Sequence, residues 1–476
     1  MIVWPYSSKE VGMSANGKSY IKNVELFTDI NDKDFSVESI RMHKLANKRD
    51  SLFWNKYRTD SLTIKEITTY HVIDSLGQKL KFDSILKILE KVALYKIPLS
   101  FVDIDLTKIF TSNKFEGSRL GIGLHTNERI LKFLSIGGFF GYGLKDHQWK
   151  YGGEFILTID ENEELKINGK YQNTLIESGR SGLKYFNQNY YELRDFLISQ
   201  MDRKIQNTFS IGFRTMKYAK LNISINQTQV KPQFSYEYLL NDFQKITNYS
   251  YTDLTVNLRY ANKEKIISSF NQRISMGSKY PVLYISYTKG LKNLFNSEFD
   301  FNRIELRIEE SFLTKNFGET KFRLDAGYID KPLPYSLLFT GEGCYDKNLP
   351  VLLKNYFQTI TPNEFLSDRY VNFHFSHNFS SLLFKPKKFS PHITLHQNIG
   401  FGKLSNPYKH KLIEFKTKEK GFYESGIQFD NIIKLNYLNI AYIGVGAGVY
   451  YRYGPYAYEK TENNLAIKFS LTFTTK

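Results

Sequence analysis

After Phe115, and almost to the end of the chain, hydrophobic and polar residues alternate with a period of two. Ile304, Leu306 and Ile308 alternate with arginine and glutamate, and the segment from Leu465 to Phe473 repeats the pattern with smaller or polar residues between large apolar ones. Because successive side chains of a strand point to opposite faces, each such segment is predicted to be a β-strand with one apolar and one polar face.

The number and length of these segments indicate what solvates the apolar faces. We count about fifteen segments of roughly ten residues, whereas strands of soluble proteins average about five or six residues and membrane-crossing strands take about 9–11. A soluble sandwich would have to bury every apolar face, while a barrel in lipid turns those faces to acyl chains and lines its lumen with the polar ones. The pattern therefore predicts an all-β fold, a transmembrane antiparallel β-barrel. The segments begin near Arg119, Leu131, Trp149, Glu164, Ile205, Leu221, Thr252, Val282, Arg303, Lys321, Arg369, His392, Phe422, Asn439 and Asn464.

Single-chain bacterial barrels have even strand numbers, so we expect 16 strands, with the missing one at Lys265 to Ser275. With both chain ends on the periplasmic side, Asp330 to Asp368 would connect strands 11 and 12 at the outer surface, and it is too long for a simple turn. A second long insertion, Gly179 to Met201, has apolar residues at helical spacing and is predicted to form a helix that caps or plugs one end. The sequence leaves open which end.

The region before the barrel is predicted to be a short α-helical periplasmic segment, residues 1–114, with the barrel at residues 115–476. Thr63 lies three residues before Glu66, the spacing of a capping box, and the helix that starts there is expected to end at Gly77. A second amphipathic helix is expected from Asp83 or Ser84. The first ten residues have no basic start leading into an apolar run, so either the protein stays in the cell or its true N-terminus lies upstream.

Composition and charge exclude several classes of protein. Only 41% of the residues are hydrophobic, which excludes a helical membrane protein. The single Cys344 excludes an intramolecular disulfide framework and a cysteine-rich metal site. The formal charge of +17, from 65 basic and 48 acidic residues, is spread over strands and loops without a basic helix or stacking motif, so nucleic acid is not an expected partner.

Catalytic and metal sites have little support. His374 and His377 are an odd number of residues apart and point to opposite faces of a strand, while His392 and His396 share a face but lie about 13 Å apart. His374 and Ser376 share the polar face, as a Ser/His pair on the wall of an outer-membrane lipase would, but this spacing is common by chance. We therefore expect no catalytic residues, no metal and no cofactor.

Several motifs carry a family resemblance, in order along nearly the whole chain. They include Phe53-Trp54-Asn55-Lys56-Tyr57-Arg58, Phe115-Glu116-Gly117-Ser118, Leu258-Arg259-Tyr260-Ala261 and Asn363-Glu364-Phe365-Leu366-Ser367-Asp368-Arg369-Tyr370. On these residues the chain resembles a Bacteroidota outer-membrane β-barrel family, a domain of unknown function that usually follows a carboxypeptidase-regulatory-like β-sandwich. The resemblance implies an outer-membrane location, with a signal peptide and the sandwich domain upstream of this chain. It also implies structural roles, in the lumen or loops, for Trp54, Arg58, Glu116, Gly117, Arg259, Glu364, Asp368 and Arg369.

The family barrel is similar in turn to the superfamily of BamA/TamA-type outer-membrane insertases and two-partner secretion transporters, which have 16 strands and a long loop folded into the lumen. In that superfamily the loop usually bears a Val-Arg-Gly-Phe-like tip, whereas the corresponding stretch here, Phe339 to Gly343, lacks the arginine. No POTRA-like modules precede the barrel either. Both departures count against an insertase role.

We therefore expect a non-enzymatic outer-membrane barrel that acts in envelope biogenesis by moving, inserting or anchoring a protein or lipid partner. A transporter or receptor for a small ligand is the alternative, and a lipid hydrolase is third. Outer-membrane lipids, including lipopolysaccharide, are the expected partners, together with envelope proteins. Opposite charges on the polar faces of adjacent strands are expected to pair inside the barrel. These residues are Arg303, Glu305, Arg307, Glu309, Lys321, Arg323 and Asp325.

Overall fold

The computed structural model describes residues 20–21, 24–25, 38–41, 49–79, 95–160, 164–183, 193–241, 243–269, 272–315, 317–380, 382, 391–437 and 441–475. The chain forms two compact units. One comprises Met1–Leu99 with Lys263–Ser278, and the other comprises Ser100–Asn262 with Lys279–Lys476.

The smaller unit combines two helices with a small sheet. Helix α1 (Ser51–Tyr57) begins where the Asp50 carboxylate accepts a hydrogen bond from the Phe53 amide at 2.8 Å. Helix α2 (Ile64–Lys79) begins with the predicted capping box, because the Glu66 carboxylate accepts from the Thr63 amide at 2.7 Å. The second predicted helix, at 83–95, falls almost wholly outside the described residues. The sheet contains β1 (Glu38–Arg41), β14 (Ile266–Ser269) and β15 (Gln272–Ser275), and β2 (Lys96–Leu99) ends the first segment.

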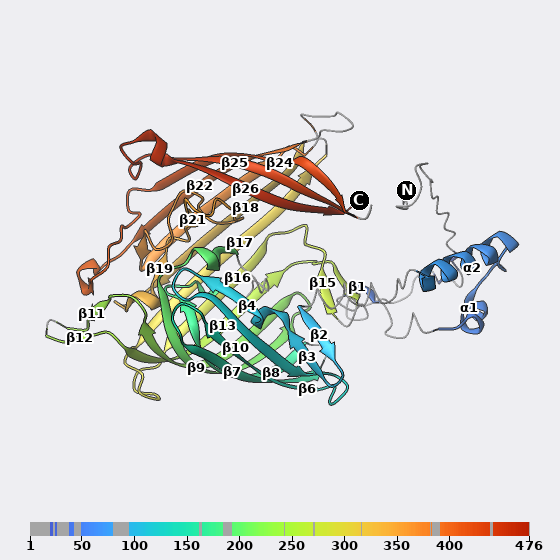
Figure 1. The fold of residues 1–476 in the computed structure, drawn as a ribbon, viewed down its shortest axis with the longest axis horizontal. Helices are drawn as coiled ribbons and strands as arrows, with labels where there is room; N and C mark the ends of the chain where they lie inside the picture. Colours follow the sequence, from blue (N-terminus) through green and yellow to red (C-terminus); the bar gives the residue numbers. More distant parts are fainter. Residues whose placement is uncertain are drawn as a thin grey trace. The chain divides into compact units, whose positions relative to one another are not determined.

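The larger unit is one antiparallel sheet curled into a barrel (Figure 1). Each of the fifteen predicted segments forms one long strand, and neighbours in sequence pair in register around the sheet. The strands are β5 (Gly117–Thr126), β6 (Leu134–Gly143), β7 (Trp149–Asp160), β8 (Leu165–Glu177), β9 (Met201–Thr215), β10 (Ala219–Pro232), β13 (Tyr249–Ala261), β16 (Val282–Gly290), β17 (Phe301–Thr314), β18 (Gly318–Ile329), β21 (Arg369–Asn378), β22 (His392–Lys403), β24 (Phe422–Tyr437), β25 (Ala441–Tyr453) and β26 (Leu465–Thr475).

The position before β5 is occupied by two short strands. Strands β3 (Val102–Asp105) and β4 (Phe110–Asn113) both pair with β5, and the 3-10 helix η3 (Leu106–Lys108) separates them. The sequence prediction of a further barrel strand at Lys265 to Ser275 is wrong, because β14 and β15 form a hairpin in the smaller unit. Residues 100–114, which the sequence grouped with the N-terminal segment, thus contribute to the barrel sheet.

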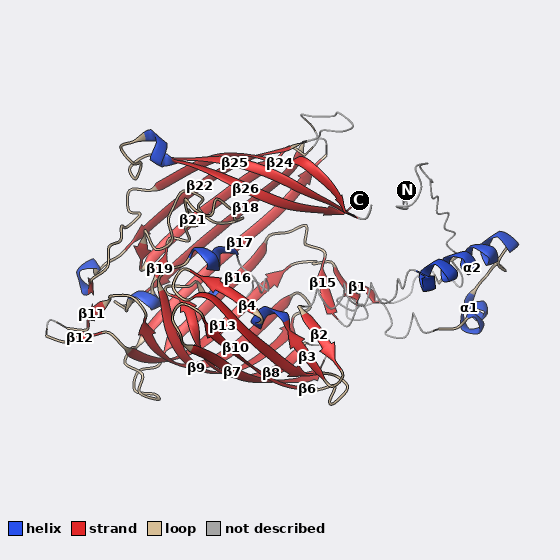
Figure 2. Cartoon of the chain, in the orientation of Figure 1, coloured by secondary structure: helices blue, strands red, loops and turns tan. Residues whose placement is uncertain are grey.

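The alternation of strand direction places the two long insertions at the same end of the barrel (Figure 2). Residues 178–200 follow β8 and residues 330–368 follow β18, and both strands run towards what we call the loop end. Strand β3 starts, and β26 ends, at the opposite end, which we call the terminal end. With β3 and β4 counted as one strand, residues 330–368 join strands 11 and 12, as expected.

Shorter elements lie in the connections at the loop end. Strands β11 (Glu237–Leu239), β12 (Lys245–Ile246) and β23 (His410–Lys411) form one small sheet, and β19 (Phe339–Thr340) pairs with β20 (Leu366–Ser367). The 3-10 helices are η5 (Leu193–Leu197), η6 (Tyr335–Leu337), η7 (Pro407–Lys409) and η8 (Thr461–Asn464).

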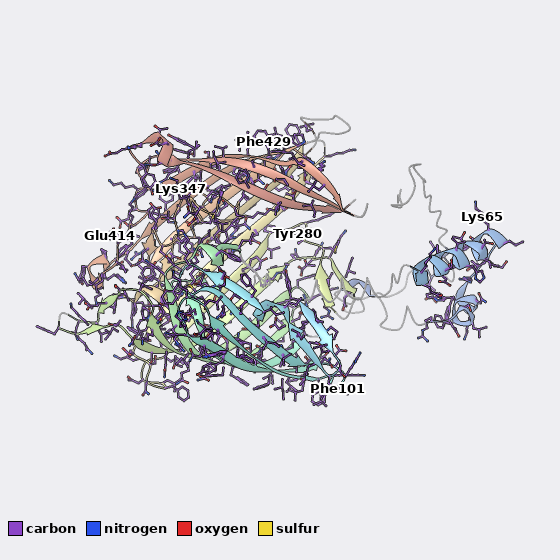
Figure 3. All side chains as sticks on the ribbon, viewed as in Figure 1. Lys65, Phe101, Tyr280, Lys347, Glu414 and Phe429 are labelled. Atoms are coloured by element: carbon purple, nitrogen blue, oxygen red, sulfur yellow. The ribbon has the colours of Figure 1, made fainter. Side chains whose placement is uncertain are left out.

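The two faces of the wall differ in chemistry, and side chains project from both (Figure 3). On β21, Val371 is 44% exposed, whereas its neighbour Asn372 is 1% exposed and His374 is 6% exposed. An apolar outer face with a buried polar inner face fits a wall solvated by hydrocarbon outside. No helix in the described ranges is both long and apolar enough to cross a membrane.

A candidate functional site in the barrel lumen

Residues 330–368, which we call the lumen loop, are folded into the loop end of the barrel. Phe357, Ile360 and Phe365 are fully buried, as is Cys344. The loop begins with η6 and then forms the β19–β20 pair. Its side chains and backbone groups bind inward-facing residues of β17, β18, β24, β25 and β26, so the loop fills this part of the lumen.

Strand β17 binds both the lumen loop and the 178–200 connection. Arg303 donates to the carbonyl of Leu337 at 3.2 Å, and its guanidinium lies 4.6 Å above the Phe339 ring. Arg303 also pairs with Glu305 at 2.9 Å. The Glu305 carboxylate accepts hydrogen bonds from the Ser181 hydroxyl at 2.5 Å and from a backbone amide of the 178–200 connection. The Arg303–Glu305 pair thus binds the lumen loop and the 178–200 connection to one strand.

The next charges along β17 and β18 form a second group. Asp325 accepts from Arg307 at 2.6 Å and from Arg323 at 2.5 Å, and Glu309 lies 3.9 Å from both arginines. Arg323 also lies 3.7 Å from Glu342 of the lumen loop. Of the seven residues predicted as a lumen charge cluster, Lys321 alone lies apart, in an exposed pair with Glu319 at 2.9 Å.

Glu424 on β24 is a second anchor for the lumen loop and is fully buried. Its carboxylate accepts from the amides of Gln358 and Thr359 at 3.0 and 2.6 Å, and from the Thr359 hydroxyl at 2.5 Å. Asn398 of β22 donates to it at 2.7 Å. Removal of this carboxylate would leave several buried donors without an acceptor, which is a costly state.

Arg452 on β25 and Glu364 of the lumen loop form a two-bonded ion pair. The two guanidinium nitrogens lie 2.8 and 3.2 Å from the two carboxylate oxygens. Arg452 is 0% exposed and also lies 4.4 Å above the Tyr458 ring. Glu364 keeps a second, longer contact to Lys416 at 3.4 Å. A parallel fork of this kind fixes both direction and distance, so it sets the position of the loop against β25.

Residues 346–352 of the lumen loop, which we call the seam segment, bond to both edges of the sheet. Asp346 forms an ion pair with Lys114, which directly follows β4. Val351 makes a parallel bridge to Phe469 of β26: the Phe469 amide donates to the Pro350 carbonyl at 2.7 Å, and the amide at position 352 donates to the Phe469 carbonyl at 2.8 Å. The loop thus supplies hydrogen bonds to the edge of the last strand.

The 178–200 connection adds a buried contact to the lumen loop through η5. Arg194 pairs with Glu177 at the end of β8 and donates to the Gly343 carbonyl at 3.0 Å. Burial by itself would lower the pKa of Arg194, but the Glu177 carboxylate outweighs it and raises that pKa, so the guanidinium stays charged. A helix was predicted over 179–201. Residues 184–192 lie outside the described residues, and η5 is the helical turn that the structure describes there.

Burial shifts the pKa of one titratable group in the lumen loop and of one group beside it. It raises the pKa of the Cys344 thiol to about 12, so this thiol is unreactive while the loop is in place. It lowers the pKa of Lys418 to about 8, although this ammonium donates to Asn372 at 2.8 Å and lies 5.0 Å above the Phe357 ring. Both residues are reporters of whether the loop is seated.

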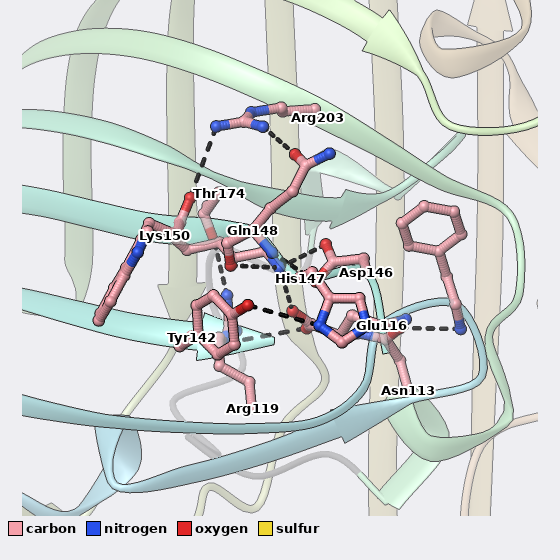
Figure 4. Close-up of polar contacts among 12 residues, drawn as sticks. Asn113, Glu116, Arg119, Tyr142, Asp146, His147, Gln148, Lys150, Thr174 and Arg203 are labelled. Atoms are coloured by element: carbon pink, nitrogen blue, oxygen red, sulfur yellow. Dashed lines mark hydrogen bonds and ion pairs between the residues drawn. The ribbon is translucent and has the colours of Figure 1, made fainter. Parts of the chain in front are cut away.

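Glu116 of the family motif is the centre of a buried polar network near the start of β5 (Figure 4). It accepts from Asn113 at 2.7 Å and pairs with Lys150 at 3.0 Å, and Arg119 lies 3.8 Å away. Gly117 has a φ of +68°, a left-handed conformation in which a Cβ would also lie 3.1 Å from a neighbouring side chain. The motif therefore pairs a buried carboxylate with a turn that requires glycine.

The other motif residues occupy separate places. Trp54 lies in α1 and Arg58 caps its end, both in the smaller unit. Arg259 faces the lumen, 5.8 Å above the Tyr284 ring. Asp368 and Arg369 pair at 2.9 Å where the lumen loop enters β21. The motifs are therefore not one site but several points at which the chain turns or crosses the lumen.

The arrangement gives no support to catalysis. In the part of the chain that the structure describes, no three His, Cys, Asp or Glu side chains converge as metal ligands. His374 hydrogen-bonds Asn398 at 3.0 Å, and its ring lies against Phe357. The histidine is thus committed to packing and to an amide rather than to activation of Ser376.

Sequence reasoning missed the anchors that hold the lumen loop, namely Glu424, Arg452, Arg194 and Lys418. The signal for Glu424 was its place on the polar face of a strand segment. Arg452 was hidden between two tyrosines in a stretch that reads as an aromatic girdle. Partners far apart in sequence give no local pattern.

Long antiparallel strands with an apolar outer and a polar inner face, and with a loop folded into the lumen at one end, define a transmembrane antiparallel β-barrel. Residues 100–417 match the family described as "Family of unknown function (DUF5686) C-terminal domain", and the chain belongs to this family. No curated protein matches the sequence.

Several solved structures are similar to this chain. BamA from Haemophilus ducreyi lacking POTRA domains 1–3 matches with 10% identity and a TM-score of 0.47, over 77% of this chain and 69% of that one. CdiB from Acinetobacter baumannii matches with 12% identity and a TM-score of 0.39, over 77% and 58% of the two chains. CdiB from Escherichia coli matches with 9% identity and a TM-score of 0.40, over 80% and 64%. This chain thus spans less than two thirds of either CdiB chain.

Proposed function

We propose that this protein is a non-enzymatic component of outer-membrane biogenesis, which moves, inserts or anchors a protein or lipid partner and is not an open pore. Its location would be the outer membrane, and its partners would be outer-membrane lipids, including lipopolysaccharide, and envelope proteins. The filled lumen supports this role over free diffusion, because buried side chains of the wall bind the lumen loop: Arg303 and Glu424 by hydrogen bonds, and Arg452 by an ion pair with Glu364.

The observation that carries the proposal is the bond between the seam segment and β26. A strand edge in hydrocarbon must satisfy its backbone groups, because each unsatisfied group costs several kcal/mol. At Phe469 a loop residue, not a barrel strand, makes these hydrogen bonds. A loop can leave without unfolding the wall, so another strand or an amphiphile could take its place. A simple diffusion channel has no use for an exchangeable edge of this kind.

Single-channel recording in planar bilayers tests the proposal. The wild type should give little steady conductance. Leu352→Pro removes the amide that donates to the Phe469 carbonyl and should raise the frequency of openings, whereas Leu352→Ala keeps that amide and is the matched control. A large steady conductance of the wild type, unchanged by Leu352→Pro, would contradict the proposal and favour the alternative, a transporter or receptor for a small ligand.

The partner itself is best sought by affinity purification from native membranes. The proposal expects an envelope protein or a defined lipid to be retained by the wild type at a constant ratio, and expects Leu352→Pro to change that ratio while Leu352→Ala does not. Release of acyl chains from added phospholipid or lipopolysaccharide would instead support the third hypothesis, a lipid hydrolase.

A further inference from the structure

The outer face of the barrel wall carries a groove of about 940 Å³ across strands β7 to β10. Gly153 and Gly169 line it, and it is bordered by Tyr171 and Phe209, which are 39% and 46% exposed. A Cβ at Gly153 would approach the Gly137 carbonyl at 3.5 Å and nothing closer, so this glycine leaves space on the sheet. A groove in a wall face that meets hydrocarbon is suited to an acyl chain.

The chemistry of the outer face changes in order from this groove towards the loop end of β9 and β10. Successive outward positions on a strand are two residues apart, so cross-strand pairs define levels along the wall. The levels, in order, pair Phe209 with Ile225, Asn207 with Gln227, Ile205 with Gln229, and Arg203 with Lys231. The wall thus runs from apolar side chains through amides to cations, and Asn207 donates to Gln227 at 3.1 Å.

The two cations at the last level are held only by neutral groups. The Arg203 guanidinium donates to the Asn173 side chain at 2.9 Å, to the Gln148 side chain (Figure 4) and to the Trp149 carbonyl at 3.5 Å. Lys231 is exposed. Within the ranges that the structure describes, neither cation forms an ion pair with a carboxylate. Like charges on cross-strand partners repel, and an anion bound between them would relieve this repulsion.

We propose that this part of the wall binds one membrane lipid with a phosphate head group. The phosphate lies between Arg203 and Lys231, which supply charge-assisted hydrogen bonds to its oxygens. An acyl chain lies in the groove. The Arg203 level and the Asn207 level are about 13 Å apart along the strand, so a single lipid reaches from the cations into the groove. The Gln229 amide between them faces the carbonyl groups that link acyl chains to the head group.

This site gives the lipid partner of the proposed function a place, and it rests on that function only for the membrane around the wall. The seam segment has no part in it. Lipid binding here and the conductance change in Leu352→Pro can therefore fail separately, and failure of one leaves the other test valid.

Native mass spectrometry of the full chain in a neutral detergent tests the site. The probes are phosphatidylglycerol, phosphatidylcholine with the same acyl chains, and glycerol phosphate. The first phosphatidylglycerol adduct should form at a roughly tenfold lower concentration than the first phosphatidylcholine adduct, because choline brings its own positive charge to the two cations. Glycerol phosphate has no acyl chain for the groove and should give no adduct at concentrations that saturate phosphatidylglycerol binding.

Substitutions separate the two halves of the site. Lys231→Gln and Arg203→Gln should each weaken phosphatidylglycerol binding roughly fivefold and leave phosphatidylcholine binding unchanged, which a merely structural role would not do. Gly153→Leu fills the groove and should weaken the binding of both lipids. Lys321→Gln removes the same charge from the lumen face, where Lys321 pairs with Glu319, and should change nothing.

Three outcomes would overturn the proposal. One is phosphatidylglycerol binding that is no tighter than phosphatidylcholine binding. Another is lipid binding that Lys231→Gln, Arg203→Gln and Gly153→Leu all leave at the wild-type affinity, which would mean ordinary lipid contact around the barrel. The third is glycerol phosphate binding as tight as that of the lipid. The thermal unfolding midpoint of each variant without lipid shows that it is folded, and the exposed Lys231 gives a substitution that leaves the packed wall intact.

Discussion

Replacement of Arg452 by methionine should release the lumen loop from β25. Methionine fills a similar length of buried space but carries no charge and no donors, so the substitution removes the fork to Glu364 and the hydrogen bond from the guanidinium to the Tyr456 carbonyl at 2.6 Å. Glu364 is left with Lys416 at 3.4 Å as its remaining cation. The wall strand itself keeps its backbone pairs, so the effect should fall on the loop.

The size of the effect follows from burial. Loss of one partner of a buried ion pair costs about 3–5 kcal/mol, because the other charge stays desolvated. The contact between Glu364 and Lys416 retains part of the attraction, so we expect the lower limit, about 3 kcal/mol. At about 1.4 kcal/mol per factor of ten, the population of the released loop should rise roughly a hundredfold.

The single cysteine of the chain is a native reporter for this release. Cys344 is 0% exposed with the loop in place, and it becomes reactive when the loop leaves. The rate of maleimide labelling in detergent should therefore rise roughly a hundredfold in Arg452→Met, in proportion to the opened population. Lys321→Met, which removes a cation from an exposed pair with Glu319, should label at the wild-type rate.

A double variant tests the reasoning further. In Arg452→Met with Glu364→Leu no charge is stranded, and replacement of a buried pair by apolar residues is often neutral. The double variant should therefore label more slowly than Arg452→Met. If it labels as fast as the single variant, or if Arg452→Met labels no faster than the wild type, the ion pair does not hold the loop and the reasoning is refuted.

Two further predictions concern the turn at the start of β5 and the buried lysine. Gly117→Ala should lower the thermal unfolding midpoint, because a left-handed alanine costs about 1–2 kcal/mol. Gly153→Ala is the control and should leave the midpoint unchanged, since Gly153 has an ordinary backbone conformation. Equal midpoints of the two variants would contradict the requirement for glycine in the turn. The pKa of Lys418 falls from 10.5 to about 8 on folding, so the unfolded chain binds more protons between these values and stability should rise with pH in that window. This is checked by the thermal unfolding midpoints of the wild type and of Lys418→Met, measured between pH 8 and 10. The wild-type midpoint minus the variant midpoint should rise with pH, and a fall would refute the reasoning.

Local patterns were sufficient for the wall of the barrel. The alternation in segments such as Leu465 to Phe473 identified every long strand, since the period of two follows from strand geometry alone. It failed where the pattern is short: β3 and β4 are four residues each, and the hairpin at Ile266–Ser275 resembled a barrel strand although it belongs to the smaller unit. The sequence pattern therefore predicts which segments form strands, but it does not predict which of these strands belong to the barrel.

The sequence by itself determined the fold class and which face of each strand meets lipid, because a side chain's direction on a strand depends only on its neighbours. The tertiary structure alone decided what fills the lumen. Arg452 meets Glu364 across 88 positions, and Val351 meets Phe469 across a still longer separation, from position 351 to position 469. Contacts at such separations depend on how the whole sheet curves, and one chain carries no local trace of them.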